Sequence, residues 1–355
     1  MKAQLYDTGD RLEYVEKRIE KSSLSESNID DLLQMKLELL AGGLSEHRVS
    51  TVLSQFVSLQ DLIDFELEDA DREDLLQLAR KINQDEVNER DHSVWTLCEY
   101  KKALKAYYSW KTGEEHPDCL GFMRVHPSES SKPKIDPDEL LDTRMAEKII
   151  NKASNPRDKA FLALLWDSGA RISEILNLEW KDLVFKDELL AVNFREGKNG
   201  PRKIYLVECK PLIRNWKIWK EDHTELEPED PVFTKYRPYS STEVFTYRNA
   251  RKQVSDIVSR TDIPDRIKTN PHSWRKARAT DMASKGMTQP NMNAYFGWVP
   301  GSSASRYYIR LAARDLEKQV RDMYPGIREL PDEGPQYLGE NIPEYDQTDL
   351  RPYLE

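Results

Sequence analysis

The stretch Asn270-Pro271-His272-Ser273-Trp274-Arg275-Lys276 indicates both the local fold and the chemistry of the second half of this chain. Asn-Pro suits a helix start, because asparagine caps free backbone N–H groups and proline fits the first helical position. In such a helix His272 and Arg275 are three residues apart and project from one face. An imidazole and a guanidinium on one face can contact the same anion. The stretch therefore predicts a helix that presents a phosphate site.

A second arginine stands far upstream, in Ser168-Gly169-Ala170-Arg171-Ile172-Ser173-Glu174. Arg171 comes at the expected start of a helix, where backbone N–H groups and a guanidinium can both face a phosphate. The alternative is a surface arginine that caps its own helix beside Glu174. If Arg171 does face a phosphate, we expect Glu174 to orient the site.

A late tyrosine completes the set, in Arg306-Tyr307-Tyr308-Ile309-Arg310-Leu311. Two guanidiniums can neutralise the oxygens of one phosphodiester, the histidine can handle a proton, and a phenol oxygen can attack the phosphorus. Phenol has a pKa near 10, so nearby cations are needed to make the phenolate accessible. The set predicts phosphodiester cleavage with a tyrosine nucleophile.

Composition limits the remaining possibilities. Charged residues make up 33% of the 355 residues, and no apolar run is long enough to cross a bilayer. The N-terminus lacks the apolar segment of a secretory signal, and three scattered cysteines without ligand spacing favour a reduced, cytoplasmic protein without a metal site. The net charge is −10, but residues 325–355 alone hold eight acids and two bases. The segment 266–278 is locally basic, so DNA binding remains compatible with the acidic total.

The chain is expected to be mainly α-helical with a small β-hairpin. Four helical runs between residues 29 and 113 predict a small helical domain (1–113), and a segment rich in proline and serine predicts a linker (114–137). A mixed α/β domain follows (138–322). Its expected hairpin pairs 189–194 with 202–207 across Gly197-Lys198-Asn199-Gly200-Pro201. Its expected helices are 138–152, 157–168, one opening at 171, 211–220, 241–260, 272–285, 288–296 and 303–322. Residues 323–355 read as an acidic tail.

The order of these motifs resembles the tyrosine recombinase (phage integrase) family, and is closest to archaeal Xer-like and integrase members. The resemblance covers roughly residues 25–322. Single motifs would be weak, but all of them occur in order: Gly43–Val49, Asn155–Ala160, Ser168–Glu174, the Gly-Lys-x-Gly-x-Arg hairpin, Asn270–Arg275, Phe296-Gly297-Trp298, and Tyr308-Ile309-Arg310-Leu311-x-x-Arg314-Asp315.

The resemblance implies a role for each site residue. Lys198 would be the general acid that protonates the leaving 5′ oxygen, with Lys203 as its rival and a solvated turn lysine as the alternative. His272 would accept or position the tyrosine proton, and Arg171 and Arg275 would neutralise the phosphate. Tyr308 fits the surrounding pattern without a gap, whereas counting from Trp298 would select Tyr307.

Two positions depart from the commoner family pattern. Lys276 stands where many members have histidine, so it would contribute charge only. Trp298 replaces another histidine; its indole N–H can donate to a phosphate oxygen, and the alternative is packing in the core.

The implied protein is a site-specific recombinase that cleaves and rejoins double-stranded DNA through a 3′-phosphotyrosyl intermediate, without metal, nucleotide or other cofactor. The N-terminal domain would be a core-binding, SAM-like clamp on the DNA. Recombination implies a homotetramer on DNA, with a monomer or dimer off it, and no membrane partner. The alternatives are relaxation of DNA by a type IB topoisomerase and a non-catalytic DNA-binding relative.

Overall fold

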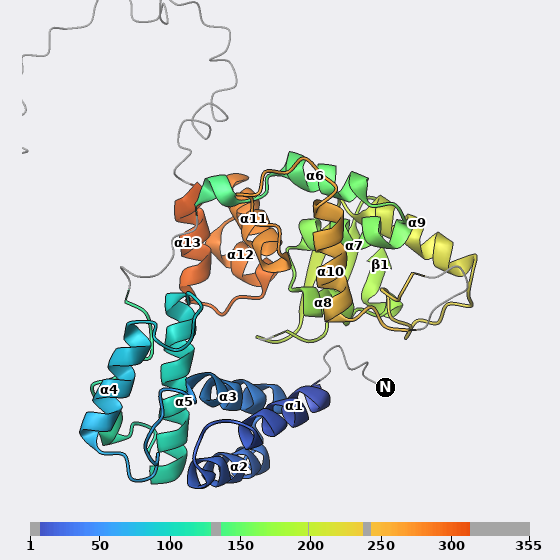
Figure 1. Ribbon diagram of the computed structural model, residues 1–355. Helices are drawn as coiled ribbons and strands as arrows, with labels where there is room; N and C mark the ends of the chain where they lie inside the picture. Colours follow the sequence, from blue (N-terminus) through green and yellow to red (C-terminus); the bar gives the residue numbers. More distant parts are fainter. Residues whose placement is uncertain (1–7, 129–135, 198, 237–242, 313–355) are drawn as a thin grey trace, which may run out of the picture. The chain divides into compact units, whose positions relative to one another are not determined.

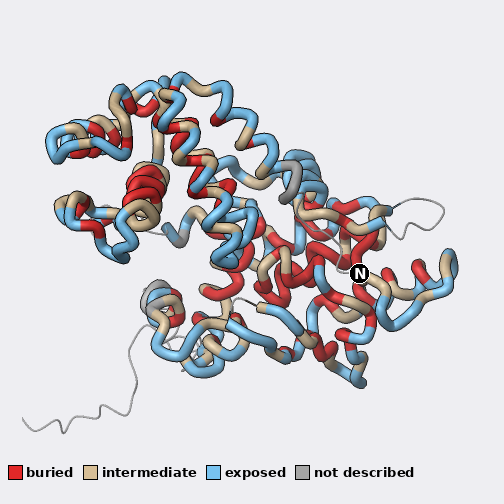
Figure 2. Tube along the Cα trace, turned by 90° about the horizontal axis from the view of Figure 1, so that it is seen from below, coloured by how far each residue is buried: buried red, intermediate tan, exposed pale blue. Residues whose placement is uncertain are grey.

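The computed structural model describes residues 8–128, 136–197, 199–236 and 243–312. The chain divides into two compact units, Met1–Asp136 and Pro137–Glu355, here called the N-terminal and C-terminal units. In both, buried stretches lie inward and exposed stretches outward (Figure 2). None of the helices in the described ranges combines the length and apolar character that crossing a bilayer requires.

The N-terminal unit is helical. Its helices are α1 (Thr8–Glu20), α2 (Glu26–Ala41), α3 (Glu46–Leu59), α4 (Arg72–Asn83), α5 (Val94–Thr112) and the short 3-10 helix η1 (Asp118–Leu120). Ser25, Ser45, Asp71 and Ser93 cap the N-termini of α2 to α5, each accepting a backbone N–H of the first turn. Apolar residues of all five α-helices form one core, which Leu120 joins from within the segment expected as a linker.

Helix α1 is additional to the four helices expected from the sequence. Most of its residues are polar, but Val15 and Ile19, four residues apart, are buried and pack into the core of the unit. One pair of apolar residues is a weak periodic signal. The contact with α3 stabilises this helix, and that contact cannot be read from local sequence.

The C-terminal unit is also mainly helical. It contains α6 (Thr143–Lys152), α7 (Pro156–Ser168), α8 (Ile172–Leu176), α9 (Lys210–Glu221), α10 (Tyr247–Val258), α11 (Pro271–Ser284), α12 (Gln289–Phe296) and α13 (Ser303–Ala312), with 3-10 turns η3 (Pro137–Glu139) and η4 (Trp180–Asp182). Figure 1 shows α11, α12 and α13 gathered on one side of this unit, and α9 with β1 on the other. The continuation of α13 expected up to residue 322 lies outside the described residues, as does the acidic tail.

A three-stranded antiparallel sheet, ordered β1-β2-β3, accompanies the helices. The expected hairpin is present as β2 (Leu190–Phe194) and β3 (Arg202–Leu206), with Val192 opposite Ile204. The third strand, β1 (Leu183–Phe185), was not expected because three residues are too few for a periodic pattern. The molecule is thus mainly α-helical with one small sheet, as the sequence predicted.

Helix α7 forms the centre of the C-terminal unit. It is buried along nearly its whole length, and its middle, from Ala160 to Trp166, is continuously apolar instead of amphipathic. It contacts α6, α9 and α11. Helix α8 follows directly, and α11 packs on both α7 and α13. This arrangement brings the start of α8, the start of α11 and the helix α13 to one region.

Candidate active site

The corner between α7 and α8 fixes Arg171. Gly169 ends α7 in the left-handed conformation (φ 52°), and a Cβ added there would lie 2.6 Å from Cε1 of Phe296. Only glycine combines this backbone angle with so close a neighbour. The turn leaves Arg171 at the N-terminal cap of α8 with its side chain partly exposed. The corner therefore presents a guanidinium at a helix start, as the sequence predicted.

Glu174 joins two arginines. Its carboxylate accepts the backbone N–H of Arg171 (2.8 Å) and Nη1 of Arg171 (2.8 Å), and it accepts both terminal nitrogens of Arg202 (3.1 and 2.8 Å). Burial acts to raise the pKa of Glu174, but the hydrogen bonds and charge of Arg202, together with Arg171, outweigh it and lower that pKa. Glu174 is thus a buried carboxylate that orients Arg171. The capping contact at this helix start is made by Glu174, which accepts the Arg171 backbone N–H, and not by the Arg171 side chain.

Lys198 lies outside the described residues, so its side chain is not placed. The residues on either side of it are described. Asn199 donates a hydrogen bond from Nδ2 to the carbonyl of Gly297 (2.8 Å). A Cβ added at Gly197 would lie 3.3 Å from Oε1 of Glu174. The hairpin turn that carries Lys198 therefore lies against both the Arg171 corner and the Trp298 segment.

Helix α11 holds Arg275 inside the unit, with 4% of its surface exposed. Its guanidinium donates to the carbonyls of Gly169 (2.8 Å) and Phe296, which tie α11 to the α7–α8 corner and to the end of α12. Burial, and then the positive charge of Arg171, lower the pKa of Arg275 to about 10. The charge of Glu174 acts in the opposite direction, and Arg275 still carries its charge at neutral pH. Two neighbouring guanidiniums favour an anion between them.

His272 lies one helical turn before Arg275 on α11, and it is exposed. Loss of hydration, and then the charges of Lys276, Arg275 and Arg171, lower its pKa below the usual 6.5. The imidazole is consequently neutral at pH 7, the form that can accept a proton. Lys276 is partly buried, and burial followed by the charge of Lys268 lowers its pKa.

Trp298 and Tyr308 lie face to face. Their ring centroids are 5.5 Å apart with planes 8° apart, and Phe296 also stacks on Trp298, with ring centroids 4.8 Å apart. The guanidinium carbon of Arg275 is 5.5 Å from the Trp298 ring centroid. Trp298 therefore has the packing contacts expected as its alternative role, in addition to its position beside Arg275.

The two candidate nucleophiles differ in burial. Tyr308 is 9% exposed and Tyr307 is 38% exposed. Burial raises the pKa of Tyr308 to about 12, although the charge of Arg275 acts to lower it. The phenol is thus neutral in this state. A tyrosine that serves as a nucleophile must first lose its proton, and nearby cations ease that loss.

Sequence reasoning missed the part played by Arg202, which stands in the Gly-Lys-x-Gly-x-Arg pattern. Besides Glu174, it donates from Nε to the carbonyl of Tyr295 (3.0 Å) and lies over the Phe194 ring. Gly297 passes so close that an added Cβ would lie 3.2 Å from Arg202. A signal was present, because Arg202 is the last residue of that pattern and begins the second strand of the expected hairpin. Its partner could not be inferred.

A second buried network was also not foreseen. Arg278, one turn after Arg275 on α11, donates to Asp167 (2.8 Å), Asp281 (2.8 Å) and Glu208 (3.1 Å). The hydroxyl of Tyr295 donates to the carbonyl of Asp167. These contacts fasten α11 and α12 to the end of α7, and so fix the helix that carries His272 and Arg275. In the described part of the chain, no three His, Cys, Asp or Glu side chains are grouped as metal ligands would be.

Known proteins are similar to this chain in sequence. Residues 139–314 match the phage integrase family. The tyrosine recombinase XerA of Pyrococcus furiosus is 25% identical over 232 residues, which cover 65% of this chain and 75% of that protein. A tyrosine recombinase of Thermosipho africanus is 22% identical over 308 residues, covering 82% of this chain and 98% of that protein.

Solved structures show the same fold. A lambda integrase dimer bound to a COC′ core site has a TM-score of 0.60 at 15% identity, covering 81% of this chain and 79% of that one. XerH site-specific recombinase bound to a palindromic difH substrate has a TM-score of 0.57 at 16% identity, covering 90% and 99%. The class of protein that these comparisons define is the site-specific tyrosine recombinases, which act on DNA. The chain belongs to the phage integrase family.

Proposed function

We propose that this protein cleaves and rejoins double-stranded DNA at specific sites through a 3′-phosphotyrosyl link to Tyr308. One observation carries the proposal: Arg171, Arg275, His272, Trp298 and Tyr308, from distant parts of the sequence, belong to one cluster in the C-terminal unit. Arg275 lies next to Trp298, and Trp298 stacks on Tyr308. Burial, followed by the charges of Lys276, Arg275 and Arg171, lowers the pKa of His272.

The chemistry assigned to this cluster conserves the energy of the phosphodiester. The Tyr308 oxygen attacks the phosphorus while the bond to the 5′ oxygen breaks, and His272 takes the phenol proton. Arg171 and Arg275 neutralise the two non-bridging oxygens as charge builds on them, and the indole N–H of Trp298 is available as a further donor. Lys198 is assigned the proton for the leaving 5′ oxygen. Attack by a 5′-hydroxyl on the phosphotyrosine reverses the steps and rejoins a strand, so the sequence of steps consumes no nucleotide.

The partners follow from the same proposal. The relatives of known structure include a lambda integrase tetramer bound to a Holliday junction. We assign double-stranded DNA as the substrate and four protomers as the assembly that exchanges strands. The helical domain (1–113) is assigned as the clamp on the DNA, joined through residues 114–137 to a catalytic domain (138–322), with an acidic tail (323–355).

The nucleophile can be tested on a nicked suicide substrate, from which the cut fragment diffuses away and leaves the covalent adduct trapped. Tyr308→Phe should abolish the adduct and retain DNA binding, whereas Tyr307→Phe should still form it. If Tyr308→Phe forms the adduct and Tyr307→Phe does not, the assignment of the nucleophile is wrong. A wild-type protein that forms no adduct on its own site would refute cleavage altogether.

The general acid can be tested with a substrate whose bridging 5′ oxygen is replaced by sulfur. A thiolate leaves without protonation because a thiol is far more acidic than an alcohol. Lys198→Ala should lose cleavage of ordinary DNA and regain it on the sulfur substrate, whereas Lys203→Ala should resemble wild type on both. The reverse pattern would assign the role to Lys203.

Relaxation of supercoiled DNA by a topoisomerase is the competing activity. A plasmid with two copies of the recognition site separates the two functions. Recombinant products support the proposal, and relaxed plasmid without recombinants supports the competitor.

A further inference from the structure

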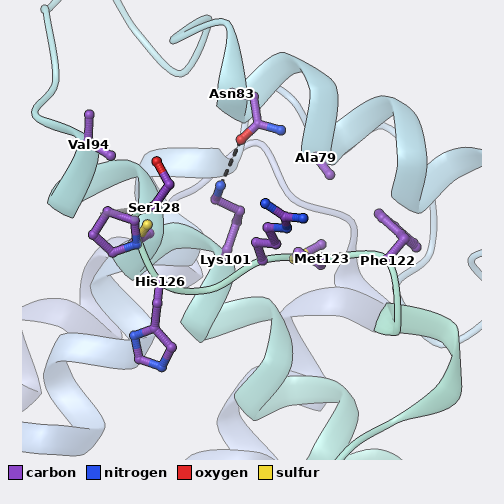
Figure 3. Close-up of a pocket in the computed structure, with 11 residues that line it drawn as sticks. Ala79, Asn83, Val94, Lys101, Phe122, Met123, His126 and Ser128 are labelled. Atoms are coloured by element: carbon purple, nitrogen blue, oxygen red, sulfur yellow. Dashed lines mark hydrogen bonds between the residues drawn. The ribbon is translucent and has the colours of Figure 1, made fainter. Parts of the chain in front are cut away.

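The N-terminal unit contains a cavity that the recombinase chemistry does not use. It has a volume of about 310 Å³ and lies between the end of α4, the first turns of α5, and the segment 122–128. In Figure 3 Lys101 points from α5 toward Asn83 on α4, with Val94 on one side and Ala79 and Phe122 on the other. The volume suits a small ligand.

Lys101 is the unusual residue of this cavity. It is 8% exposed, and its Nζ donates to Oδ1 of Asn83 at 2.7 Å. An ammonium has three hydrogens to donate, and Asn83 is a neutral partner. Asn83 is the last residue of α4, whose C-terminal dipole favours a nearby cation and offsets part of the cost of burial. Within the described residues, Lys101 has no ion pair with a carboxylate.

A second cation lines the same cavity. Arg124 is exposed and has no hydrogen bond or ion pair to any side chain or backbone group that the structure describes. No aspartate or glutamate is among the described residues that line the cavity, although the chain as a whole is acidic. The wall beside the two cations is apolar and includes Val94 and the partly buried Phe122. His126 also lines the cavity, but its ring points away from Lys101 (Figure 3).

We propose that this cavity is a binding site for a phosphate group, held by Lys101 and Arg124. A buried ammonium with unused donors and an arginine fork without a partner together offer several hydrogen bonds and two charges to one anion. The group comes either from a free phosphate ester of mononucleotide size, whose body would lie on the apolar wall, or from the backbone of bound DNA. The residues of this site belong to the N-terminal unit and include neither Arg171 nor Arg275, and the proposal does not depend on the recombinase chemistry.

The test is calorimetric titration of the full-length protein with inorganic phosphate and, separately, with AMP. The wild type should bind both, and Lys101→Met should weaken the binding at this site by about 10- to 100-fold, the loss expected for a charged hydrogen bond. Arg124→Gln, which removes no contact within the described protein, should weaken it in the same direction. Binding of phosphate at Arg171 and Arg275 would be equal in all variants, so the difference between proteins reports the cavity.

Lys102→Met is the matched control. Lys102 is on the same helix and pairs with Glu99, outside the cavity. It should bind phosphate and AMP as the wild type does. A purely structural role for Lys101, as a partner of the α4 end, would lower the melting temperature of Lys101→Met without changing the titrations. That result, together with unchanged DNA affinity, would overturn the proposal.

The source of the phosphate is decided by competition. If duplex DNA displaces AMP, and Lys101→Met binds the duplex more weakly than Lys102→Met, the group belongs to the DNA backbone. If AMP stays bound in the presence of duplex, the site takes a free phosphate ester.

Discussion

The interiors of the two units differ in how many charged side chains they bury. Among the described residues of the N-terminal unit, Lys101 is the one charged side chain that is buried. The described part of the C-terminal unit buries eight: Arg157, Asp158, Asp167, Glu174, Asp182, Lys220, Arg275 and Arg278. The first unit is a conventional apolar helix core, and the second places ion pairs inside its core.

The difference reflects what each interior must do. Burying a charged group costs several kcal/mol unless a partner compensates it, so buried ion pairs add little net stability to a fold. In the C-terminal unit the buried pairs hold helices α8 and α11 so that Arg171, His272 and Arg275 keep fixed positions. Preorganised cations stabilise developing charge better than cations that must first move. The buried pairs of the C-terminal unit therefore serve to hold cations in fixed positions more than to stabilise the fold.

The largest expected effect comes from breaking the Arg278 network. Arg278→Met leaves Asp167 buried without its guanidinium, and should lower the free energy of unfolding by about 3–5 kcal/mol. Chemical denaturation measures this. Lys285→Met, which removes the exposed partner of Asp281, should cost only about 0–1 kcal/mol. Equal costs for the two variants would mean that the buried ion pairs stabilise the C-terminal unit no more than an exposed pair does.

In the N-terminal unit a comparable loss of stability should come from removing buried apolar volume instead of a buried charge. Leu53 is fully buried in α3, and Leu53→Ala should lower the free energy of unfolding by about 3 kcal/mol through a cavity. Leu37→Ala, at an exposed position of α2, should change it by less than about 0.5 kcal/mol. Denaturation curves compare the two, and a similar cost at both positions would contradict the assignment of the core.

Arg202 tests whether the buried pairs serve the chemistry. Arg202→Lys keeps the charge and loses the two-pronged contact with Glu174, so Arg171 is less well oriented. Single-turnover cleavage should fall about 10- to 100-fold, the cost of a small misplacement, while the dissociation constant for DNA stays near that of wild type. A parallel loss of DNA affinity would mean that Arg202 acts through binding or general stability.

The smallest effect is the pH dependence set by His272. Its lowered pKa keeps the imidazole neutral and able to accept a proton at pH 7; protonation removes that ability as the pH falls through the lowered value, below 6.5. The value of kcat/KM should then fall about tenfold per pH unit, because it reports groups of the free enzyme. His272→Gln should lose this dependence. A limb that persists in His272→Gln would belong to another group.

The sequence predicted what local patterns can encode. Asn270-Pro271 marked the start of α11, and the glycines and asparagine between residues 197 and 200 marked the β2–β3 hairpin. Capping and turn chemistry act over a few residues, so local sequence encodes them. It did not predict α1, whose two buried residues depend on α3. Nor did it predict that Arg202 meets Glu174, or that Arg278 meets Asp167, because the partners of a buried charge are chosen by tertiary packing. The roles assigned to Arg171, Lys198, His272, Arg275, Trp298 and Tyr308 stay predictions.

The tight corner at Gly169 has an evolutionary consequence. Its Cα faces the ring of Phe296, Phe296 stacks on Trp298, and Trp298 stacks on Tyr308. A side chain at position 169 would push on the first ring, and the displacement would pass along the stack to the phenol. Position 169 should therefore stay glycine among relatives that keep Phe296, because the left-handed backbone and the neighbouring ring each exclude a side chain there.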